Sequence, residues 1–481
     1  MMRKSIVRGL SLLAVLGPIG LFASPPSARA EEPRRRPNIV LILADDLGVG
    51  ELGCYGQSKI KTPAIDRLAT EGMRWTQWYA GANVCAPSRC SLLTGLHTGH
   101  TAIRTNGAGQ FLKNDDTTLA EVLSNAGYET AAFGKYGLGN EGTAGHPNRQ
   151  GFGEFFGYLD QVHAHFYYPY FLWHNETRSP LPENEGKRQG QYAHDLIFNK
   201  AIDFIKKPHE RPFFLYWAPT IPHVELVVPE ESARPYKGQF PESPLPDPRP
   251  GYLSSDTPYA TFAGMVNRLD DQVGQLVATL KAQGLDEETI LFFTSDNGPQ
   301  GGAWKRLSDF FEGKGSLRGY KGDSYEGGIR VPLIARWPGQ VKAGSISKHP
   351  SAAWDFMATF ADLAGTKLNT PTDGISIVPT LLGKEEGQLG HDYLYWELTP
   401  LGQPLAQQCA IRVGNWKGVK PSPRKPWELY DLQADPEETQ DLAAKEPDRI
   451  KELADKAESA RSTPRSHPKP DHQPGIADFV R

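Results

Sequence analysis

A cysteine stands at the predicted start of a short helix within residues 85–95 (CAPSRCSLLTG), where it could act as a nucleophile or bind an anion. Pro87 suits the first helical position because it has no N–H to leave unpaired, and Gly95 suits the helix end. Cys85 then precedes the free N–H groups and the positive end of the helix dipole, which stabilise an anion. Arg89, one turn later, can face the same point. The alternative is a capped helix with a buried structural thiol.

Three carboxylates and one amide follow two apolar runs of strand length, residues 37–44 and 289–295. These side chains are Asp45, Asp46, Asp296 and Asn297. Charges at the end of a buried strand are costly unless compensated, and in open α/β sheets this end is where ligands bind. Oxygen ligands suit Ca²⁺ or Mg²⁺ better than Zn²⁺. The sequence therefore predicts one divalent ion here, and the alternative is two unrelated solvated turns.

Two lysines and a histidine occupy comparable positions. Lys135 follows an apolar run, His223 follows another through a loop, and Lys321 lies in a glycine-rich basic segment. Cations placed in advance stabilise negative charge that develops on a leaving oxygen. His223 is the predicted donor of a proton to that oxygen, because a histidine pKa lies near neutrality. The alternatives are surface lysines and a structural histidine.

Strands and helices alternate over most of the chain. The predicted strands are 37–44, 128–133, 212–217 and 289–295, and the predicted helices are 63–71, 118–126, 193–206, 259–282 and 354–364. Continuous apolar runs suit strands buried on both faces of a parallel sheet. We therefore predict an α/β fold with a large, mostly parallel mixed sheet and helices on both faces.

The pattern changes after about residue 390. Short strands are predicted at 393–396, 409–413, 416–419 and 428–432, followed by a charged helix at 448–460. We predict a catalytic domain over residues 31–388 and a small C-terminal subdomain over 389–461, with an antiparallel sheet and one helix. The Pro- and His-rich residues 462–481 are predicted to be a loose tail.

The first thirty residues have the pattern of a secretory signal. A basic start precedes the apolar residues 9–23, and an A-x-A site ends at Ala30. A membrane anchor is the alternative, but the apolar run is short and contains Pro18. We predict cleavage after Ala30, export to the periplasm or the medium, and no stable membrane anchor. Export permits a disulfide, but the sequence leaves pairing among Cys54, Cys90 and Cys409 open.

The composition is that of an ordinary globular protein. The chain has 481 residues, of which 39% are hydrophobic and 22% charged. That length can bury a large core. The net charge of −4 gives no reason to expect nucleic acid as a partner.

The motif Cys-x-Pro-Ser-Arg at residues 85–89, followed by Leu-Leu-Thr-Gly, resembles the signature of the type I sulfatases, in the alkaline phosphatase superfamily. The resemblance implies that a formylglycine-generating enzyme oxidises Cys85 to formylglycine (3-oxoalanine). This aldehyde hydrates to a gem-diol, one oxygen of which attacks sulfur. The family also implies one Ca²⁺ ion.

The resemblance extends to individual residues over nearly all of the mature chain. Asp45, Asp46, Asp296 and Asn297 match the calcium ligands, together with Cys85 as formylglycine. Arg89 matches the arginine that holds the formylglycine and the metal environment, Lys135 and Lys321 match the sulfate-binding lysines, and His223 matches the histidine near the leaving oxygen.

One position departs from the family pattern. Many relatives read Gly-Lys-Trp-His-Leu-Gly, and their histidine contacts the diol and helps sulfate elimination. The equivalent residue here is Gly137, which has no side chain. His163 and His165 are the candidates to replace that histidine or to bind substrate.

Together these features predict an exported, calcium-dependent sulfatase for sulfated carbohydrates or small sulfate esters. Two alternatives stay open at this point. One is hydrolysis of phosphate mono- or diesters, which requires ligands for a second metal. The other is a catalytically silent carbohydrate-binding protein, a reading that Gly137 favours and the intact cysteine motif opposes.

Overall fold

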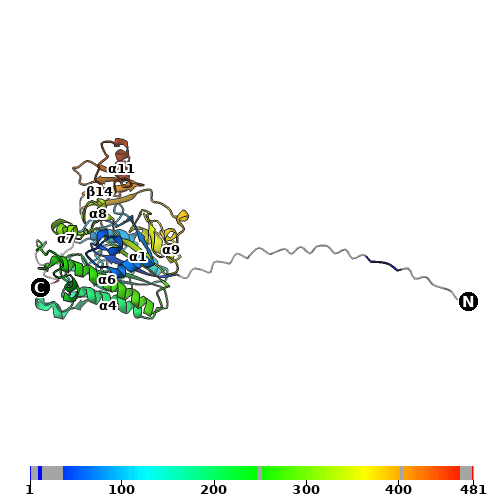
Figure 1. Cartoon of the computed structure of the whole chain (residues 1–481), viewed down its shortest axis with the longest axis horizontal. Coiled ribbons are helices and arrows are strands. Elements are labelled where there is room, and N and C mark those ends of the chain that lie inside the picture. Colours follow the sequence, from blue (N-terminus) through cyan, green and yellow to red (C-terminus); the bar gives the residue numbers. More distant parts are fainter. Residues whose placement is uncertain are drawn as a thin grey trace. The chain divides into compact units, whose positions relative to one another are not determined.

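A mixed sheet of ten strands, in the order β11-β2-β10-β9-β1-β8-β4-β5-β6-β7, forms the centre of residues 36–481 (Figure 1). The computed structural model describes residues 1, 9–12, 36–107, 109–245, 252–400, 403, 405–465 and 479. The strands are β1 (Asn38–Ala44), β2 (Met73–Trp75), β4 (Glu129–Lys135), β5 (Glu154–Tyr158), β6 (Phe171–His174), β7 (Thr177–Pro180), β8 (Phe213–Ala218), β9 (Thr289–Ser295), β10 (Leu333–Arg336) and β11 (Ser345–Ser347). The five central strands, from β9 to β5, are parallel, so their carboxyl ends share one edge.

Helices cover both faces of this sheet, and β1 is therefore buried along its whole length. Val40 and Ile42 pack with α1, α4 and α6, whereas Ile39 and Leu41 pack with α2, α3 and α9. Successive strand side chains point to opposite faces, so each face needs its own apolar layer. The helices are α1 (Pro63–Glu71), α2 (Cys85–Thr94), α3 (Leu119–Asn125), α4 (Ala193–Lys206), α5 (Glu230–Ala233), α6 (Pro258–Ala282), α7 (Lys305–Phe310), α8 (Glu326–Ile329), α9 (Asp355–Leu363), α10 (Val378–Leu381) and α11 (Pro447–Ser459). The predicted α/β architecture is confirmed.

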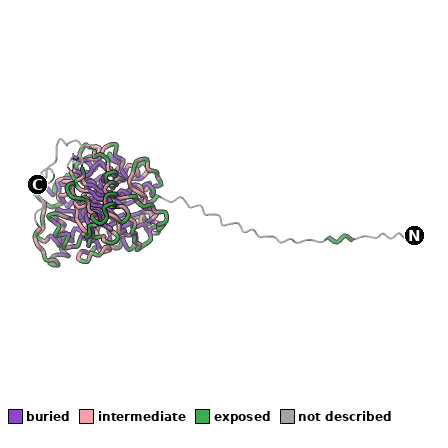
Figure 2. The backbone as a smooth tube through the Cα atoms, turned by 90° about the horizontal axis from the view of Figure 1, so that it is seen from above, coloured by how far each residue is buried: buried purple, intermediate pink, exposed green. Residues whose placement is uncertain are grey.

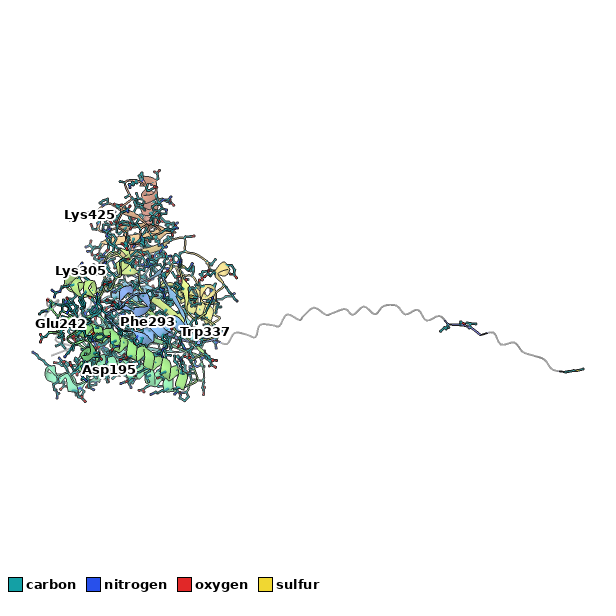
Figure 3. The ribbon with its side chains drawn as sticks, viewed as in Figure 1. Asp195, Glu242, Phe293, Lys305, Trp337 and Lys425 are labelled. Carbon is teal, nitrogen blue, oxygen red and sulfur yellow. The ribbon has the colours of Figure 1, made fainter. Side chains whose placement is uncertain are left out.

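The interior of this unit is buried and its outer segments are exposed (Figure 2). Phe293, in the middle of β9, is fully buried, whereas Lys305 and Lys425 are exposed (Figure 3). The sheet therefore gives a rigid base to the side chains at its carboxyl edge.

A second sheet, antiparallel and four-stranded, lies near α8 in the same unit (Figure 1). Its strands are β13 (Leu394–Leu398), β14 (Gln408–Val413), β15 (Trp416–Lys420) and β16 (Glu428–Asp431). Leu453 and Ala457 of α11 pack against it. The indole N–H of Trp396 donates to the carbonyl of Ala80 at 2.9 Å, which ties this sheet to the segment that leads into α2. The predicted C-terminal sheet with one helix is confirmed. A separate pair, β3 (Trp78–Tyr79) with β12 (Ser351–Ala352), completes the strands.

The terminal segments are described only in part. The predicted signal, residues 1–30, lies outside the described residues except for 1 and 9–12. Among the helices that the structure describes, none has the length and apolar character of a membrane span. In the predicted tail, Ser462 accepts a hydrogen bond from Arg104, and Phe479 is buried against His163. These two described residues of the predicted tail therefore contact the rest of the unit.

Candidate active site

The predicted carboxylates meet at the carboxyl edge of the sheet because β1 and β9 are neighbours in register. Ala44 pairs with Ser295, so the residues that follow both strands emerge side by side. The backbone N–H of Asp46 donates to Asp296 Oδ1 at 3.1 Å, and Asp46 has a φ of 62°. This left-handed turn is uncommon for a residue with a side chain. All three carboxylates are buried.

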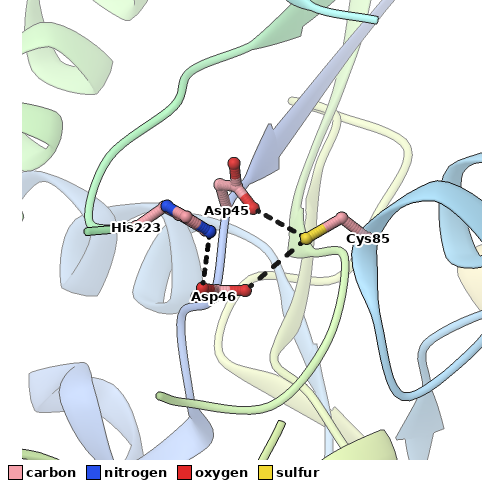
Figure 4. Close-up of side chains that lie close together, drawn as sticks. All are labelled: Asp45, Asp46, Cys85 and His223. Atoms are coloured by element: carbon pink, nitrogen blue, oxygen red, sulfur yellow. Dashed lines mark hydrogen bonds and ion pairs between the residues drawn. The ribbon is translucent and has the colours of Figure 1, made fainter. Parts of the chain in front are cut away.

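Cys85 lies against this acidic group. Its Sγ is 3.5 Å from Asp45 Oδ1 and 3.9 Å from Asp46 Oδ1 (Figure 4). Helix α2 begins at Cys85 itself, two residues earlier than we expected from Pro87. At this end Asn106 Oδ1 accepts a hydrogen bond from the N–H of Ala86 at 2.8 Å, which satisfies one of the first N–H groups of the helix. Burial raises the pKa of Cys85 to about 12, so the unmodified thiol is protonated and a poor nucleophile.

Three cations surround the carboxylates and pair with them. Arg89 donates from Nε and Nη2 to Asp296 Oδ2, at 2.9 and 2.7 Å. Lys135 Nζ is 2.8 Å from Asp45 Oδ2, and Lys321 Nζ is 2.7 Å from the carboxylate of Asp46. Arg89 also donates to the carbonyl of Lys135 at 2.8 Å, so α2 and β4 are joined at this point.

The three carboxylates have different pKa values because their charged neighbours differ. Burial alone would raise the pKa of Asp45, but the charges of Lys135 and Arg89 outweigh it and hold that pKa below its ordinary value. Burial raises the pKa of Asp296 to about 6, and the nearby charge of Asp45 adds to this. Burial also raises the pKa of Asp46. A group of acids with separated pKa values at a strand edge is typical of functional sites.

His223 joins the cluster from the loop after β8. Its Nε2 is 3.4 Å from Asp46 Oδ2, and its Nδ1 donates to the carbonyl of Val224 (Figure 4). Burial, and then the charges of Lys321 and Lys135, lower the pKa of His223 well below its ordinary value. His165 stacks on His223 with ring centroids 4.3 Å apart, and its Nδ1 is 2.5 Å from the hydroxyl of Tyr252.

The structure separates the two histidines that we considered together. His165 borders the cluster, but His163 does not. The ring of His163 is fully buried, stacked on Phe479 at 4.5 Å and tilted against Phe171 at 4.7 Å. The assignment of His163 to substrate binding is therefore corrected, because aromatic rings from distant segments enclose it.

The donor set fits a hard divalent cation. Asn297 Nδ2 donates to Asp46 Oδ1 at 2.7 Å, and Asn297 Oδ1 is a buried acceptor without a hydrogen-bond partner among the described residues. Such an acceptor beside carboxylates is what an oxygen-seeking ion satisfies. Our sequence reasoning missed Gln300, whose Nε2 donates to Asp46 Oδ2. Its position three residues after Asn297, on the same strand-end loop, was the available signal.

Comparisons with known proteins agree with this geometry. The model of the Sulfatase family matches residues 37–366, and the N-sulphoglucosamine sulphohydrolase C-terminal model matches residues 321–462. An N-acetylgalactosamine-6-O-sulfatase of Bacteroides thetaiotaomicron is 30% identical, over 89% of this chain and 94% of its own. Arylsulfatase A of Homo sapiens is 32% identical, over 80% of this chain and 74% of its own.

A solved structure shows the same fold. The crystal structure of Ps i-CgsB in complex with k-i-k-neocarrahexaose is 28% identical, with a TM-score of 0.74, and the match covers 90% of this chain and 95% of that one. The large mixed sheet with its small C-terminal sheet is thus the alkaline-phosphatase-like fold that we expected. The chain belongs to the sulfatase family and is a sulfuric ester hydrolase.

Proposed function

We propose that this enzyme is an exported, calcium-dependent sulfatase that uses a formylglycine made from Cys85 to hydrolyse sulfate esters of carbohydrates. The observation that carries the proposal is the position of Cys85. It is the first residue of α2, in contact with Asp45 and close to Arg89, Lys135 and Lys321. Similar proteins include an N-acetylgalactosamine-6-O-sulfatase and a protein solved with k-i-k-neocarrahexaose, which supports a sugar substrate.

The raised pKa of Cys85 makes its thiol a poor nucleophile. Conversion of Cys85 by a formylglycine-generating enzyme would replace this thiol with a better nucleophile. A formylglycine supplies a hydrated aldehyde whose oxygen attacks the sulfur of the ester. The chain contributes the guanidinium of Arg89 and the positive end of the α2 dipole, which stabilise negative charge at this position, while the N–H of Ala86 is already bonded to Asn106.

A calcium ion, when bound, supplies Lewis-acid polarisation of a sulfuryl oxygen. Asp45, Asp46, Asp296 and Asn297 are the proposed ligands, with the modified residue 85. Lys135 and Lys321 are the proposed contacts of the sulfate group. Their ammonium groups are held in place by Asp45 and Asp46, so they need little reorganisation to meet the charge that develops on cleavage.

His223 is the proposed proton donor to the leaving oxygen. Its Nδ1 is committed to the carbonyl of Val224, which leaves Nε2 to face the reacting groups. The nearby lysines lower its pKa in this structure. A bound sulfate ester brings negative charge beside them and therefore raises the pKa of His223 toward the range in which it can donate.

Export is part of the proposal and rests on the sequence pattern of residues 1–30. A maturing enzyme has to be modified at residue 85 before or during export, while the segment that forms α2 is still accessible. Secretion of the mature chain beginning at Glu31 is the expected outcome, and N-terminal sequencing of exported protein checks it.

Peptide mass spectrometry tests the proposal. The peptide 75–89, from protein made in a host that modifies other sulfatases, should carry an aldehyde at residue 85 that a hydrazine reagent traps. Cys90, measured in the peptide that follows, is the control, since it lies in the same helix and should stay a thiol. The aldehyde fraction should equal the active fraction in a sulfate-ester assay. A pure thiol at residue 85 in fully active enzyme, or faster cleavage of phosphate esters, would contradict the proposal.

A further inference from the structure

A polar pocket of about 150 Å³ lies where β4 and β5 end. A cavity needs only about 10–15 Å³ to hold one water molecule, so this pocket is large enough for a ligand group of several non-hydrogen atoms. Glycines give it much of its backbone wall, and its polar side chains are Asn106, Gln110, Asn140, Asp160, Gln161 and His165.

Gly137 and Gln161 lie close together in the wall of the pocket. These residues follow neighbouring parallel strands, and the N–H of Gly137 donates to the carbonyl of Leu159 at 3.0 Å. Gly137 has a φ of +77°, which disfavours a side chain. A Cβ at this position would lie 2.7 Å from Gln161 Nε2. Gln161 therefore fills the space that a side chain at residue 137 would need.

Gln161 also carries a hydrogen-bond donor that nothing in the described chain satisfies. Its Nε2 is buried and has no acceptor there. A buried donor without a partner is costly, so such groups are usually matched by water or by a ligand. A ligand oxygen in the pocket would satisfy this amide once the side chain of Gln161 turns toward it.

Three of the lining residues connect the pocket to the reacting centre. His165 stacks on His223, and Asn106 accepts the N–H of Ala86 next to the nucleophile. Gly137 stands two residues after Lys135, whose ammonium group contacts Asp45. The pocket thus lies next to the reacting centre.

The charges of the lining limit what can enter. Among the described lining residues none is a lysine or an arginine, and Asp160 is the one carboxylate. Its Oδ1 accepts the N–H groups of Val162 and His163, at 2.7 and 3.1 Å, which fixes the carboxyl group. This set favours hydroxyl and acetamido groups and disfavours a second anion.

We propose that this pocket binds the uncharged part of the sugar that carries the scissile sulfate. In this arrangement Gln161 Nε2 donates to a sugar oxygen, and Asp160 excludes a second sulfate. The inference rests on the proposed function and deepens it, because it assigns the discrimination between mono- and disulfated sugars to two residues.

The first test replaces the donor without changing the side-chain length. Gln161→Met should lower kcat/KM about 3- to 10-fold for the best substrate in a panel of monosulfated monosaccharides, since one hydrogen bond is lost. It should leave kcat/KM for 4-nitrophenyl sulfate within about twofold, because that ester has no sugar. Gln440→Met, at an exposed site in the C-terminal region, is the matched control and should change neither.

The second test concerns charge. Asp160→Asn keeps an oxygen for the N–H groups of Val162 and His163 but removes the anion. The kcat/KM ratio of disulfated to monosulfated sugars should rise about threefold or more. An unchanged ratio overturns the assignment of Asp160. Equal losses on sugar and aryl esters in Gln161→Met, or no loss on either, overturn the assignment of Gln161.

Assays of the wild-type enzyme distinguish a failure of the pocket inference from a failure of the proposed function. If aldehyde-bearing enzyme cleaves 4-nitrophenyl sulfate but prefers no monosulfated sugar over it, the pocket inference alone fails. If it cleaves no sulfate ester at all, the proposed function fails with it.

Discussion

Two clusters of buried charge can be compared in this molecule. One is the carboxyl-edge cluster, formed by Asp45, Asp46, Asp296, Arg89, Lys135, Lys321 and His223. The other, the junction cluster, lies between α8 and the C-terminal sheet. There Lys417 Nζ is 2.9 Å from Glu326 Oε1 and 2.8 Å from Glu438 Oε1. Both clusters are removed from water and both pair carboxylates with cations.

The clusters differ in how many of their polar atoms have hydrogen-bond or ion-pair partners. In the junction cluster the hydroxyl of Tyr79 donates to Glu326 Oε2 at 2.8 Å, and the N–H of Glu326 donates to Glu438 Oε2 at 2.7 Å. Asn297 Oδ1, beside the carboxyl-edge cluster, has no hydrogen-bond partner among the described residues, and the cluster borders a pocket. Burial and ion pairing are thus common to both clusters. Glu438 Oε1 has no hydrogen bond but is ion-paired with Lys417, whereas Asn297 Oδ1, after a strand end, has no such partner among the described residues.

The largest expected effect is at the nucleophile. Cys85→Ala should reduce sulfate-ester turnover by at least about 10⁴-fold, because the attacking group is gone. Its Tm should stay within a few degrees of wild type, since only one small side chain changes. Cys90→Ala, in the same helix, is the control and should remain active. Substantial turnover by purified Cys85→Ala would remove the proposed role of this residue.

A substitution in the junction cluster should lower stability and leave activity almost unchanged. Lys417→Met removes the cation that two buried carboxylates share, which costs about 3–5 kcal/mol of unfolding free energy. Denaturant unfolding measures this loss. The kcat per folded molecule should stay within about threefold of wild type, because the site is intact. A selective loss of kcat with normal stability would erase the distinction between the two clusters.

Variants of the proposed sulfate-binding Lys135 should lose turnover rate, and they should also lose stability because Lys135 is paired with the buried Asp45. Lys135→Ala is expected to lower kcat/KM by about 10²- to 10³-fold, the usual effect of removing one group that stabilises transition-state charge. Because Asp45 also loses a partner, Lys135→Met is the second variant, and it should show the same kinetic loss with better packing. Steady-state kinetics on 4-nitrophenyl sulfate with parallel thermal unfolding provide the measurement.

Calcium provides a finer comparison. A ligand at 100 times its Kd stabilises the folded state by about 2.7 kcal/mol. Added Ca²⁺ should therefore raise the Tm of chelator-treated wild type and of Lys417→Met by similar amounts, and restore activity. Asp296→Ala should show little or no increase. An equal increase in Asp296→Ala would place the ion elsewhere.

The smallest expected effect is a pH dependence in the junction cluster. Burial raises the pKa of Glu438 to about 7, above its ordinary value, although Lys417 opposes this. The folded state then binds more protons than the unfolded state, so stability falls as pH rises from about 4.5 to 7, by at most about 1.4 kcal/mol per pH unit. Glu438→Gln should flatten this slope in denaturant unfolding at several pH values. An unchanged slope would assign it to another group.

Much of the carboxyl edge could be predicted from the sequence because its signals are local. Apolar runs that end abruptly in Asp45 and Asp296 predict buried strands with polar ends, and parallel strands bring those ends together. Other features depend on contacts between distant segments. An N–H at the start of α2 is bonded to Asn106, and the surroundings of His163 are set by Phe479. The pairing of Gln161 with Gly137 likewise needs two strands in register, which no local pattern encodes.

The burial of the cations has a consequence for the ionic strength in which the enzyme can work. Mobile ions screen exposed charges over about 8 Å at physiological salt but act much less on charges enclosed by protein. Arg89 and Lys135 have fully buried side chains, and that of Lys321 is 16% exposed. The attraction of this centre for a sulfate ester should therefore persist in concentrated salt, where a patch of surface lysines would lose it.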